Sequence, residues 1–481
     1  MTDTTAFFVD LFILLTSAVV AGEVARRLGQ VALVGQLLVG VILGPTLLGP
    51  YIGLATLTPE LSALQFLGTV FILFMAGLDV VPEQITRMGA RTALMGVAIF
   101  AIPFAALSVA ARFLFPGSST LLPLFLGLTL SITALPVMGI MLVEFGLLKT
   151  RLGNLLLNTA LINELTAVTV FAVLLQLQTS SANGGIAIGI AVLSAAVFLG
   201  TIFAINSALR TLGGTPWWVA TRERLARGFR TKEAGFAFLL ICVIGASLYS
   251  QYLGLTFVVG AFYAGMLVTR ESAGPEAHRM ISGIFGAMTW GFFVPLFFAF
   301  VGVQMNLRLL LSPWEIAVFV SLAALAVLSK VGTGFSVARF NGWSRTDSLA
   351  IGHLVSSRGA VELAMAVILL GDGVFTQQTF TLVAGVGLVT TFIAPIAASR
   401  LWRSASAEDS AVFRRLNDLR GQYPPGGRDP GSLSFRILDT SALDPADGSG
   451  GGRELEADPV PKEGATGPEP PHGPPPLPKG R

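Results

Sequence analysis

The 481-residue sequence has little cysteine, little histidine and none of the common enzyme motifs. Its single cysteine, Cys242, excludes a disulfide framework and a thiolate metal cluster, and the three histidines (His278, His353 and His472) are scattered. No Gly-x-Ser-x-Gly or His-Glu-x-x-His motif occurs, and the glycine run at 448–452 lacks the Gly-Lys-Ser/Thr ending of a phosphate loop. We therefore expect neither redox nor zinc chemistry, no cofactor and no nucleic-acid partner.

Charge is also scarce. Only 12% of the residues are charged, against about 25% in a typical soluble domain, while 53% are hydrophobic and the mean hydropathy is +0.74. This balance indicates a protein of the lipid bilayer. The end of the chain differs, because residues 404–481 contain 13 of the 26 prolines, and such a composition cannot bury enough apolar surface to offset its ordering entropy. We predict a transmembrane domain over 1–403 and a disordered cytoplasmic tail over 404–481.

Apolar segments of about 20 residues are separated by loops that contain charge, proline or glycine. The first segment has Asp3 and Asp10 near its start in place of a basic region, so we expect a retained helix and not a signal peptide. The sequence thus predicts an all-α polytopic membrane protein with 13 transmembrane helices. The segments lie at 7–26, 31–49, 62–81, 92–114, 120–143, 153–177, 185–209, 233–250, 254–270, 281–303, 314–339, 347–370 and 377–402.

Nearly all of the basic residues in loops fall in every second loop, as expected if successive loops lie on opposite sides of the membrane. If the N-terminus is outside, the side opposite the cytoplasm holds only Arg112 and Arg308. The positive-inside rule therefore places the N-terminus outside and the C-terminus in the cytoplasm, in a cell membrane of the bacterial inner-membrane type. The cytoplasmic loops hold the other eighteen loop residues of this kind, which are Arg26, Arg27, Arg87, Arg91, Lys149, Arg151, Arg210, Arg222, Arg224, Arg227, Arg230, Lys232, Arg270, Arg279, Arg339, Arg345, Arg400 and Arg403.

The thirteen segments can be divided into two sets of six, with the seventh segment as a linker. The two sets then enter the membrane from opposite sides, which permits the inverted repeat common in secondary transporters. The fifth helix of each set is interrupted, at 131–136 (Ser-Ile-Thr-Ala-Leu-Pro) and at 356–359 (Ser-Ser-Arg-Gly). A single interruption is equally well read as a proline kink, but the matched pair indicates two crossed discontinuous helices at an ion site near the bilayer midplane.

Glu164 is the residue on which the functional prediction depends. It follows Asn163 and lies about eleven residues into segment 153–177, or about 16 Å, close to the middle of a hydrocarbon core about 30 Å thick. A charge at this depth costs roughly 2.5 to 3.5 kcal/mol on insertion scales, so it needs either a structural ion pair or a function. A proton and a metal cation compete for the same carboxylate oxygens, which is the minimal device for exchange.

Asp79, near the end of segment 62–81, is interpreted as a helix-end cap.

Further polar residues near the two interruptions complete the candidate site. Ser131 and Thr133 can offer hydroxyls and freed carbonyls to a cation. Arg358 can neutralise a carboxylate or a helix C-terminus but cannot carry protons, because a guanidinium keeps its proton in a protein. Glu362, one turn later, is either the structural partner of Arg358 or a second ion ligand. Lys330 is another buried cation, for which we favour a structural role in bracing the broken helices.

Eight stretches in order give the chain a resemblance to the monovalent cation/proton antiporter superfamily, over nearly all of residues 30–400. The resemblance is strongest to its second family, which includes bacterial sodium/proton and potassium efflux antiporters and plant cation/H+ exchangers. The stretches are VGQLLVGVILGP (34–45), LGTVFILFMAGLDV (67–80), SITALPVMGIMLVEFGLLKTRLG (131–153), LINELTAV (161–168), GLTFVVGAFYAGML (254–267), PLFFAFVGVQMNL (295–307), SSRGAVEL (356–363) and LVTTFIAP (388–395).

The resemblance implies a homodimer, in which a dimerisation domain holds a core domain that moves like an elevator and contains the two crossed broken helices. Members of the family carry an Asp-Asp, Asn-Asp or Gln-Asp pair whose second residue binds the ion, which maps the ion ligand onto Glu164 and its neighbour onto Asn163. The pair is Asn-Glu here, so the longer side chain departs from the family pattern. The basic residue of the second broken helix maps onto Arg358. The tail is too short and irregular for the nucleotide-binding domain that potassium-efflux members often append.

These observations predict a secondary transporter, and not an enzyme, that exchanges Na+ or K+ for H+ at Glu164. With one titratable group at the centre, the leading stoichiometry is electroneutral exchange of one cation for one proton. Two alternatives stay open: a channel-like or regulatory cation pathway without obligatory proton exchange, and a transporter of organic cations on the same fold. The choice between Na+ and K+ is also open.

Overall fold

Helices account for nearly all of the residues that the structure, a computed structural model, describes. These residues are 3–52, 57–80, 90–144, 147, 151–179, 184–213, 215, 232–269 and 275–404. The predicted disordered tail lies outside them, apart from its first residue. The α-helices are α1 (Asp3–Arg27), α2 (Ala32–Leu43), α3 (Gly49–Ile52), α4 (Pro59–Leu78), α6 (Ala90–Leu114), α7 (Leu122–Thr129), α8 (Leu135–Glu144), α9 (Arg151–Thr179), α10 (Gly184–Gly213), α12 (Lys232–Tyr252), α13 (Phe257–Leu267), α15 (Pro275–Met288), α16 (Val294–Gln304), α17 (Pro313–Phe340), α18 (Arg345–Val355), α19 (Ala360–Gly371) and α20 (Gln377–Ser404). A π-helical turn, η1 (Thr289–Phe293), joins α15 to α16, and a 3-10 turn, η2 (Leu307–Leu310), follows α16.

Each of the thirteen predicted segments coincides with helical structure. Within the described residues, nine helical stretches are long and apolar enough to cross a membrane, and α2, α13 and Phe236–Tyr252 are shorter apolar helices. The segment 120–143 is divided between α7 and α8. The all-α membrane fold is therefore confirmed, while the count of 13 spans and the inverted repeat stay predictions.

Several helices begin where the sequence offers a capping side chain. The Ser312 hydroxyl accepts a hydrogen bond of 3.2 Å from the backbone N–H of Glu315, and Pro313 occupies the first turn of α17. The Ser344 hydroxyl caps α18 in the same way at 3.1 Å from the N–H of Asp347. Such caps satisfy backbone donors that have no partner within the helix, so they fix where each span starts.

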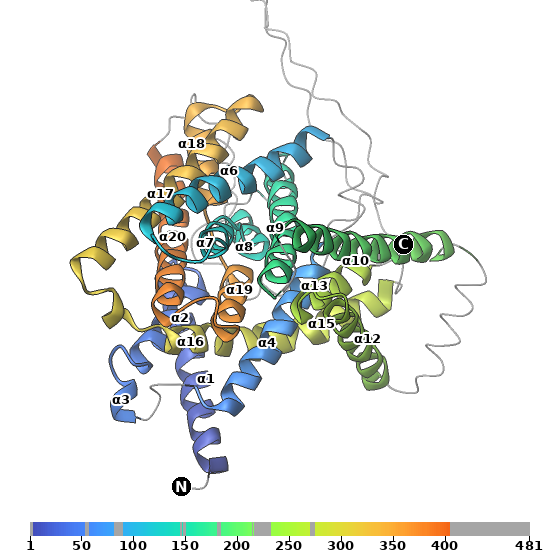
Figure 1. Cartoon of the computed structure of the whole chain (residues 1–481), viewed down its shortest axis with the longest axis horizontal. Helices are drawn as coiled ribbons and strands as arrows, with labels where there is room; N and C mark the ends of the chain where they lie inside the picture. The colour runs from blue at the N-terminus through green and yellow to red at the C-terminus, as the bar shows by residue number, and fades with distance from the viewer. Residues whose placement is uncertain are drawn as a thin grey trace, which may run out of the picture. The chain divides into compact units, whose positions relative to one another are not determined.

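The helices pack as two groups. A scaffold group contains α1, α2, α4, α12, α13, α15 and α16, and a core group contains α6 to α9 and α17 to α20. The long α10 packs against α9 of the core group and α13 of the scaffold group (Figure 1), and its role as the linker stays a prediction. The short α7 and α8 lie at the centre of the core group, between α6, α9 and α19 (Figure 1). The fold thus surrounds the first broken helix with other helices.

Two glycines let α4 and α13 touch through their backbones. A Cβ atom on Gly77 would lie 1.8 Å from the carbonyl oxygen of Phe262, and one on Gly265 would lie 2.1 Å from the carbonyl oxygen of Phe74. Small residues of this kind are how membrane helices approach closely without a hydrophobic driving force between them. The reciprocal contact makes this pair one of the tightest crossings in the scaffold group.

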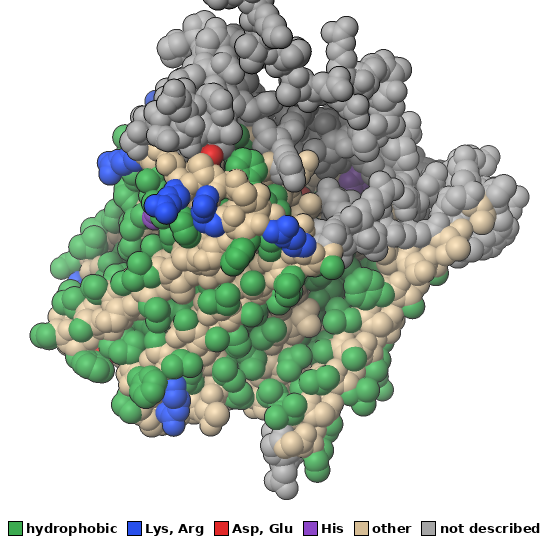
Figure 2. Space-filling view, turned by 90° about the horizontal axis from the view of Figure 1, so that it is seen from above, with side chains coloured by type: hydrophobic (Ala, Val, Ile, Leu, Met, Phe, Trp, Pro, Cys, Tyr) green, Lys and Arg blue, Asp and Glu red, His purple; other side chains and the backbone are tan. Residues whose placement is uncertain are grey.

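The surface fits an integral membrane protein. In Figure 2, hydrophobic side chains are spread over the described part of the visible face, and most of the visible Lys and Arg side chains lie near its upper edge. Large apolar side chains on the outer helices, such as Phe12, Ile186 and Leu193, are more than half exposed. An aqueous surface would make such exposure unfavourable, whereas lipid tails accept it.

Candidate functional site

Both predicted interruptions are present in the structure. The second matches its predicted bounds, because α18 ends at Val355 and α19 begins at Ala360. The first is shorter than predicted: α7 ends at Thr129 and α8 already begins at Leu135. The prediction was wrong for Leu135 and Pro136, which lie in the first turn of α8. A proline there costs nothing, because the N–H that it lacks would have had no helical partner.

The two unwound segments cross and hydrogen-bond to each other directly. The backbone N–H of Ala134 donates to the carbonyl oxygen of Ser357 at 3.3 Å, and the Thr133 hydroxyl donates to the carbonyl oxygen of Val355 at 2.9 Å. Gly359 allows this approach, since a Cβ atom there would lie 2.6 Å from the Cβ of Ala134. The two breaks therefore form one structural unit.

The adjacent residues Asn163 and Glu164 on α9 are both fully buried but have different surroundings. The Asn163 side chain accepts a hydrogen bond of 2.8 Å from the N–H of Thr133 and donates one of 3.4 Å to the carbonyl oxygen of Ser131. Neither carboxylate oxygen of Glu164 forms a hydrogen bond of normal geometry, and the donor that faces the carboxylate is the backbone N–H of Leu135 at the start of α8. A buried carboxylate without a partner is costly, so a proton or a cation at Glu164 would be strongly favoured.

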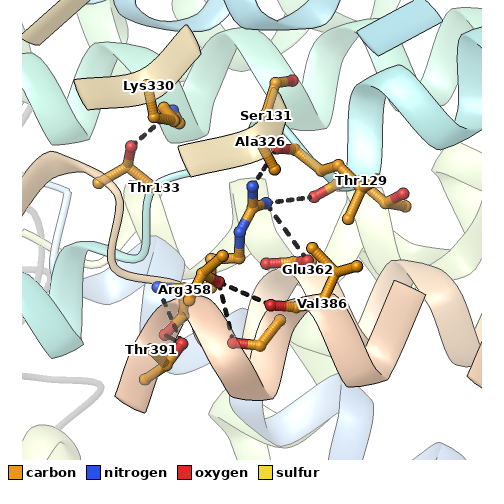
Figure 3. Close-up of polar contacts among 12 residues, drawn as sticks. Thr129, Ser131, Thr133, Ala326, Lys330, Arg358, Glu362, Val386 and Thr391 are labelled. Atoms are coloured by element: carbon orange, nitrogen blue, oxygen red, sulfur yellow. Dashed lines mark hydrogen bonds and ion pairs between the residues drawn. The ribbon is translucent and has the colours of Figure 1, made fainter. Parts of the chain in front are cut away.

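The hydroxyl groups predicted as ligands are already engaged in this conformation. Ser131 donates to the carbonyl oxygen of Leu128 at 2.9 Å. The Thr133 hydroxyl, besides donating to Val355, accepts a hydrogen bond of 2.8 Å from Lys330 Nζ (Figure 3). The structure thus brings Ser131, Thr133 and Asn163 together, with their side chains holding the break in place.

Lys330 on α17 is fully buried and lies against the first break. Its ammonium group donates to the Thr133 hydroxyl and, at 3.2 Å, to the carbonyl oxygen of Ile99 on α6. Among the residues that the structure describes, it forms no ion pair. This geometry fits the predicted bracing role, because one side chain links α17, α6 and the unwound segment.

Arg358 belongs to the second break but its guanidinium reaches the first. Nη1 lies 3.4 Å from Glu362 Oε1 and donates at 3.3 Å to the carbonyl oxygen of Thr129, and Nη2 donates to that of Leu130 (Figure 3). These carbonyls end α7, where the helix dipole is negative, so a fixed positive charge is favourable there. The ion pair favours the structural-partner interpretation of Glu362.

Two residues near the site were missed by sequence reasoning. Asp79 ends α4 as predicted, its N–H donating to the carbonyl oxygen of Met75 at 3.1 Å, but its carboxylate also lies close enough to repel that of Glu164. Thr391 on α20 hydrogen-bonds to both backbone groups of Arg358. The sequence carried no signal for either contact, because each joins residues far apart in the chain.

The arrangement defines a class of protein. Two crossed discontinuous helices, a buried carboxylate without a partner and compensating cations are the features of a secondary transporter, in which the site is shown to each side of the membrane in turn. No enzyme is indicated by such a site.

Comparison with known proteins gives the same result. Residues 13–404 match the model of the family "Sodium/hydrogen exchanger, transmembrane". The chain is 29% identical over 393 residues to the Na(+)/H(+)-K(+) antiporter GerN of Bacillus cereus, covering 81% of this chain and 94% of GerN. It is 27% identical over 380 residues to the Cation/H(+) antiporter 18 of Arabidopsis thaliana, covering 76% of this chain but only 45% of that longer protein.

The fold also matches a solved structure. The sodium proton antiporter MjNhaP1 from Methanocaldococcus jannaschii at pH 8 superposes with a TM-score of 0.61 at 15% sequence identity, covering 84% of this chain and 98% of that one. The chain belongs to the sodium/hydrogen exchanger family. It is a secondary transporter of the cation/proton antiporter class.

Proposed function

We propose that the protein exchanges Na+ or K+ for H+ across the membrane, and that Glu164 holds the cation and the proton alternately. The observation that carries this proposal is the environment of the Glu164 carboxylate: it is fully buried beside the first break, and neither of its oxygens completes a hydrogen bond. Only one of the two ions can occupy those oxygens at a time, so the binding of each displaces the other.

The residues around Glu164 supply further ligands for a cation and balance the charge near the breaks. Asn163 fixes the unwound segment from Ser131 to Thr133, and we propose that this brings backbone carbonyls within reach of a cation on Glu164. Alkali cations prefer oxygen ligands, and unwound backbone supplies them without adding charge. Arg358, Lys330 and Glu362 then balance the charge around the breaks, so that Glu164 is the group whose occupancy changes.

Alternating access requires that one part of the protein move past another. We propose that the core group carries the site and moves like an elevator against the scaffold group. The scaffold would form the homodimer that the resemblance implies. The division of the helices into two groups, with α10 between them, supports this mechanism. The longer Glu in place of the family's Asp bears on selectivity, and the relative GerN is a Na(+)/H(+)-K(+) antiporter.

The test is reconstitution into liposomes that contain a pH-sensitive dye. Addition of Na+ or K+ should move protons with the wild type, and Glu164→Gln should abolish the signal because a neutral amide cannot exchange a proton for a cation. Glu315→Gln, at the exposed start of α17, is the matched control and should leave exchange unchanged. Cation-driven proton movement in Glu164→Gln equal to that of the wild type would reject the role of Glu164.

The same vesicles can be used to measure the cation selectivity and the stoichiometry, and to test the channel-like alternative. A series with Li+, Na+, K+ and Rb+ at several pH values gives the selectivity. Exchange that does not respond to an imposed membrane potential would confirm one cation for one proton, whereas a response would point to a second proton with Glu362 as the first suspect. Current far above carrier turnover would favour the channel-like alternative.

A further inference from the structure

We propose that Thr391 is a positioning residue for ion exchange, which holds the second broken helix as Asn163 holds the first. This inference rests on the proposed function. It concerns a residue on α20 that lies outside the carboxylate site and is connected to it through Arg358 and the end of α7.

Thr391 satisfies both backbone groups of Arg358 with one hydroxyl. The hydroxyl accepts a hydrogen bond of 3.2 Å from the N–H of Arg358 and donates one of 3.2 Å to its carbonyl oxygen (Figure 3). Arg358 lies between α18 and α19, where the chain is not helical. Buried backbone groups need partners, and Thr391, which is 1% exposed, provides them where the helix does not.

The first break is held in a corresponding way. The Asn163 side chain accepts from the N–H of Thr133 and donates to the carbonyl oxygen of Ser131, so one polar side chain again satisfies a donor and an acceptor of unwound backbone. Asn163 lies on α9 and Thr391 on α20, which are the sixth helices of the two predicted repeats. The predicted inverted repeat therefore places the two residues on corresponding helices.

A buried threonine in a helix ordinarily bonds to its own helix. Thr390, the next residue, does so, donating to the carbonyl oxygens of Val386 at 2.9 Å and Gly387 at 3.0 Å. Both threonines are 1% exposed, so burial does not distinguish them. What distinguishes Thr391 is that its hydroxyl is directed across to another element.

The clamp on the backbone of Arg358 sets the position of its guanidinium. That group donates to the last carbonyls of α7, at Thr129 and Leu130, and pairs with Glu362. The chain that follows α7 is the unwound segment that contacts Asn163. If Thr391 loses its hydroxyl, the guanidinium is no longer held over the end of α7, and the cation site beside Glu164 is displaced.

The test compares three variants in proteoliposomes, with the apparent KM and the maximal rate measured for the transported cation. Thr391→Val keeps the shape of the side chain but removes the hydroxyl, and we expect the apparent KM to rise at least fivefold. Thr391→Ser restores a hydroxyl and should stay within twofold of the wild type. Thr390→Val is the matched control, and should also stay within twofold, because its hydroxyl bonds only to its own helix.

The outcomes separate this inference from the proposed function. A wild type without Glu164-dependent exchange would refute the proposed function and this inference together. An active wild type in which Thr391→Val and Thr390→Val have the same KM would overturn this inference alone. Thr391→Val that fails to fold while Thr390→Val folds would show Thr391 to be a folding residue, and would also overturn it.

Discussion

At the scale of residues, Asn163 and Glu164 differ in one property, because the amide side chain can donate hydrogen bonds and the ionised carboxylate cannot. An amide can both donate and accept, so Asn163 can satisfy a backbone N–H and a backbone carbonyl at the same time. An ionised carboxylate can only accept, and the backbone N–H of Leu135 faces that of Glu164 without completing a hydrogen bond to either oxygen. Ala160 and Ala167, on either side of the pair, are buried and small, which lets neighbouring helices approach it closely.

Lys330 is the residue whose role a single substitution can decide. If its ammonium group only braces Thr133 and Ile99, Lys330→Met keeps most of the side-chain volume and should retain Glu164-dependent exchange. The response to an imposed membrane potential should then be the same in the wild type and the variant. The measurement is dye-reported exchange in vesicles with and without a potassium diffusion potential. A potential response that is present in the wild type and lost in Lys330→Met would instead make Lys330 a second proton carrier.

At the scale of elements, the charges follow the ends of the half-helices. The carbonyl end of α7 receives the Arg358 guanidinium, and the amide end of α8 faces the Glu164 carboxylate. Glu362 lies in the first turn of α19, where a negative charge complements the positive end of the helix dipole. The two broken helices therefore account for the position of each of these charged groups.

The crossing of the broken helices depends on a missing side chain at Gly359. Its backbone is extended, with a φ of −163°, so alanine would fit the conformation but would place a Cβ atom 2.6 Å from Ala134 Cβ. We expect Gly359→Ala to lose about 1 to 3 kcal/mol of stability, the usual cost of overpacking, and most of its exchange. Melting temperature and liposome exchange are the measurements.

Two further variants control for this effect. Gly371→Ala, at the other end of α19, has nothing within 4 Å of the added Cβ and should behave as the wild type. Ala134→Gly combined with Gly359→Ala removes the opposing methyl group and should recover much of the loss. A double variant no better than Gly359→Ala would show that the close approach to Ala134 is not the cause.

The two helix breaks could be predicted from the sequence for physical reasons. A hydrophobic run interrupted by Ser131 and Thr133, or by Arg358 and Gly359, cannot continue as an ordinary lipid-exposed helix, so the breaks were predictable. The end of the first break was not, because Pro136 is tolerated in the first turn of a helix as readily as in a kink. The bond from Lys330 to Thr133 was not predictable either, since it joins residues 197 positions apart and depends on how α17 packs.

At the scale of the whole molecule, a few of the described hydrogen bonds join the two helix groups. Gln377 of α20 donates to the carbonyl oxygen of Gln304, the Thr381 hydroxyl accepts from the N–H of Asn306 at 3.1 Å, and the hydroxyls of Thr169 and Tyr263 lie 2.8 Å apart. The predicted topology places the contacts of Gln377 and Thr381 toward the outer side of the membrane, together with the hydrogen bond of 3.3 Å from Gln176 to the carbonyl oxygen of Leu253. Elevator motion would have to break them whenever the site opens outward.

A reversible cross-link tests whether they break. In a Cys242→Ser background, cysteines at Asn306 and Thr381 should form a disulfide that ties α20 to the end of α16. Oxidation should then stop exchange and a reducing agent should restore it, because the core group can no longer leave the scaffold. Cysteines at Thr376 and Thr379, whose hydroxyls lie 2.9 Å apart at the start of α20, form the control pair within the core group, and their oxidation should leave exchange intact. Full exchange with the 306–381 disulfide formed would mean that the two groups stay together here throughout the cycle, and the elevator mechanism would have to be abandoned for this protein.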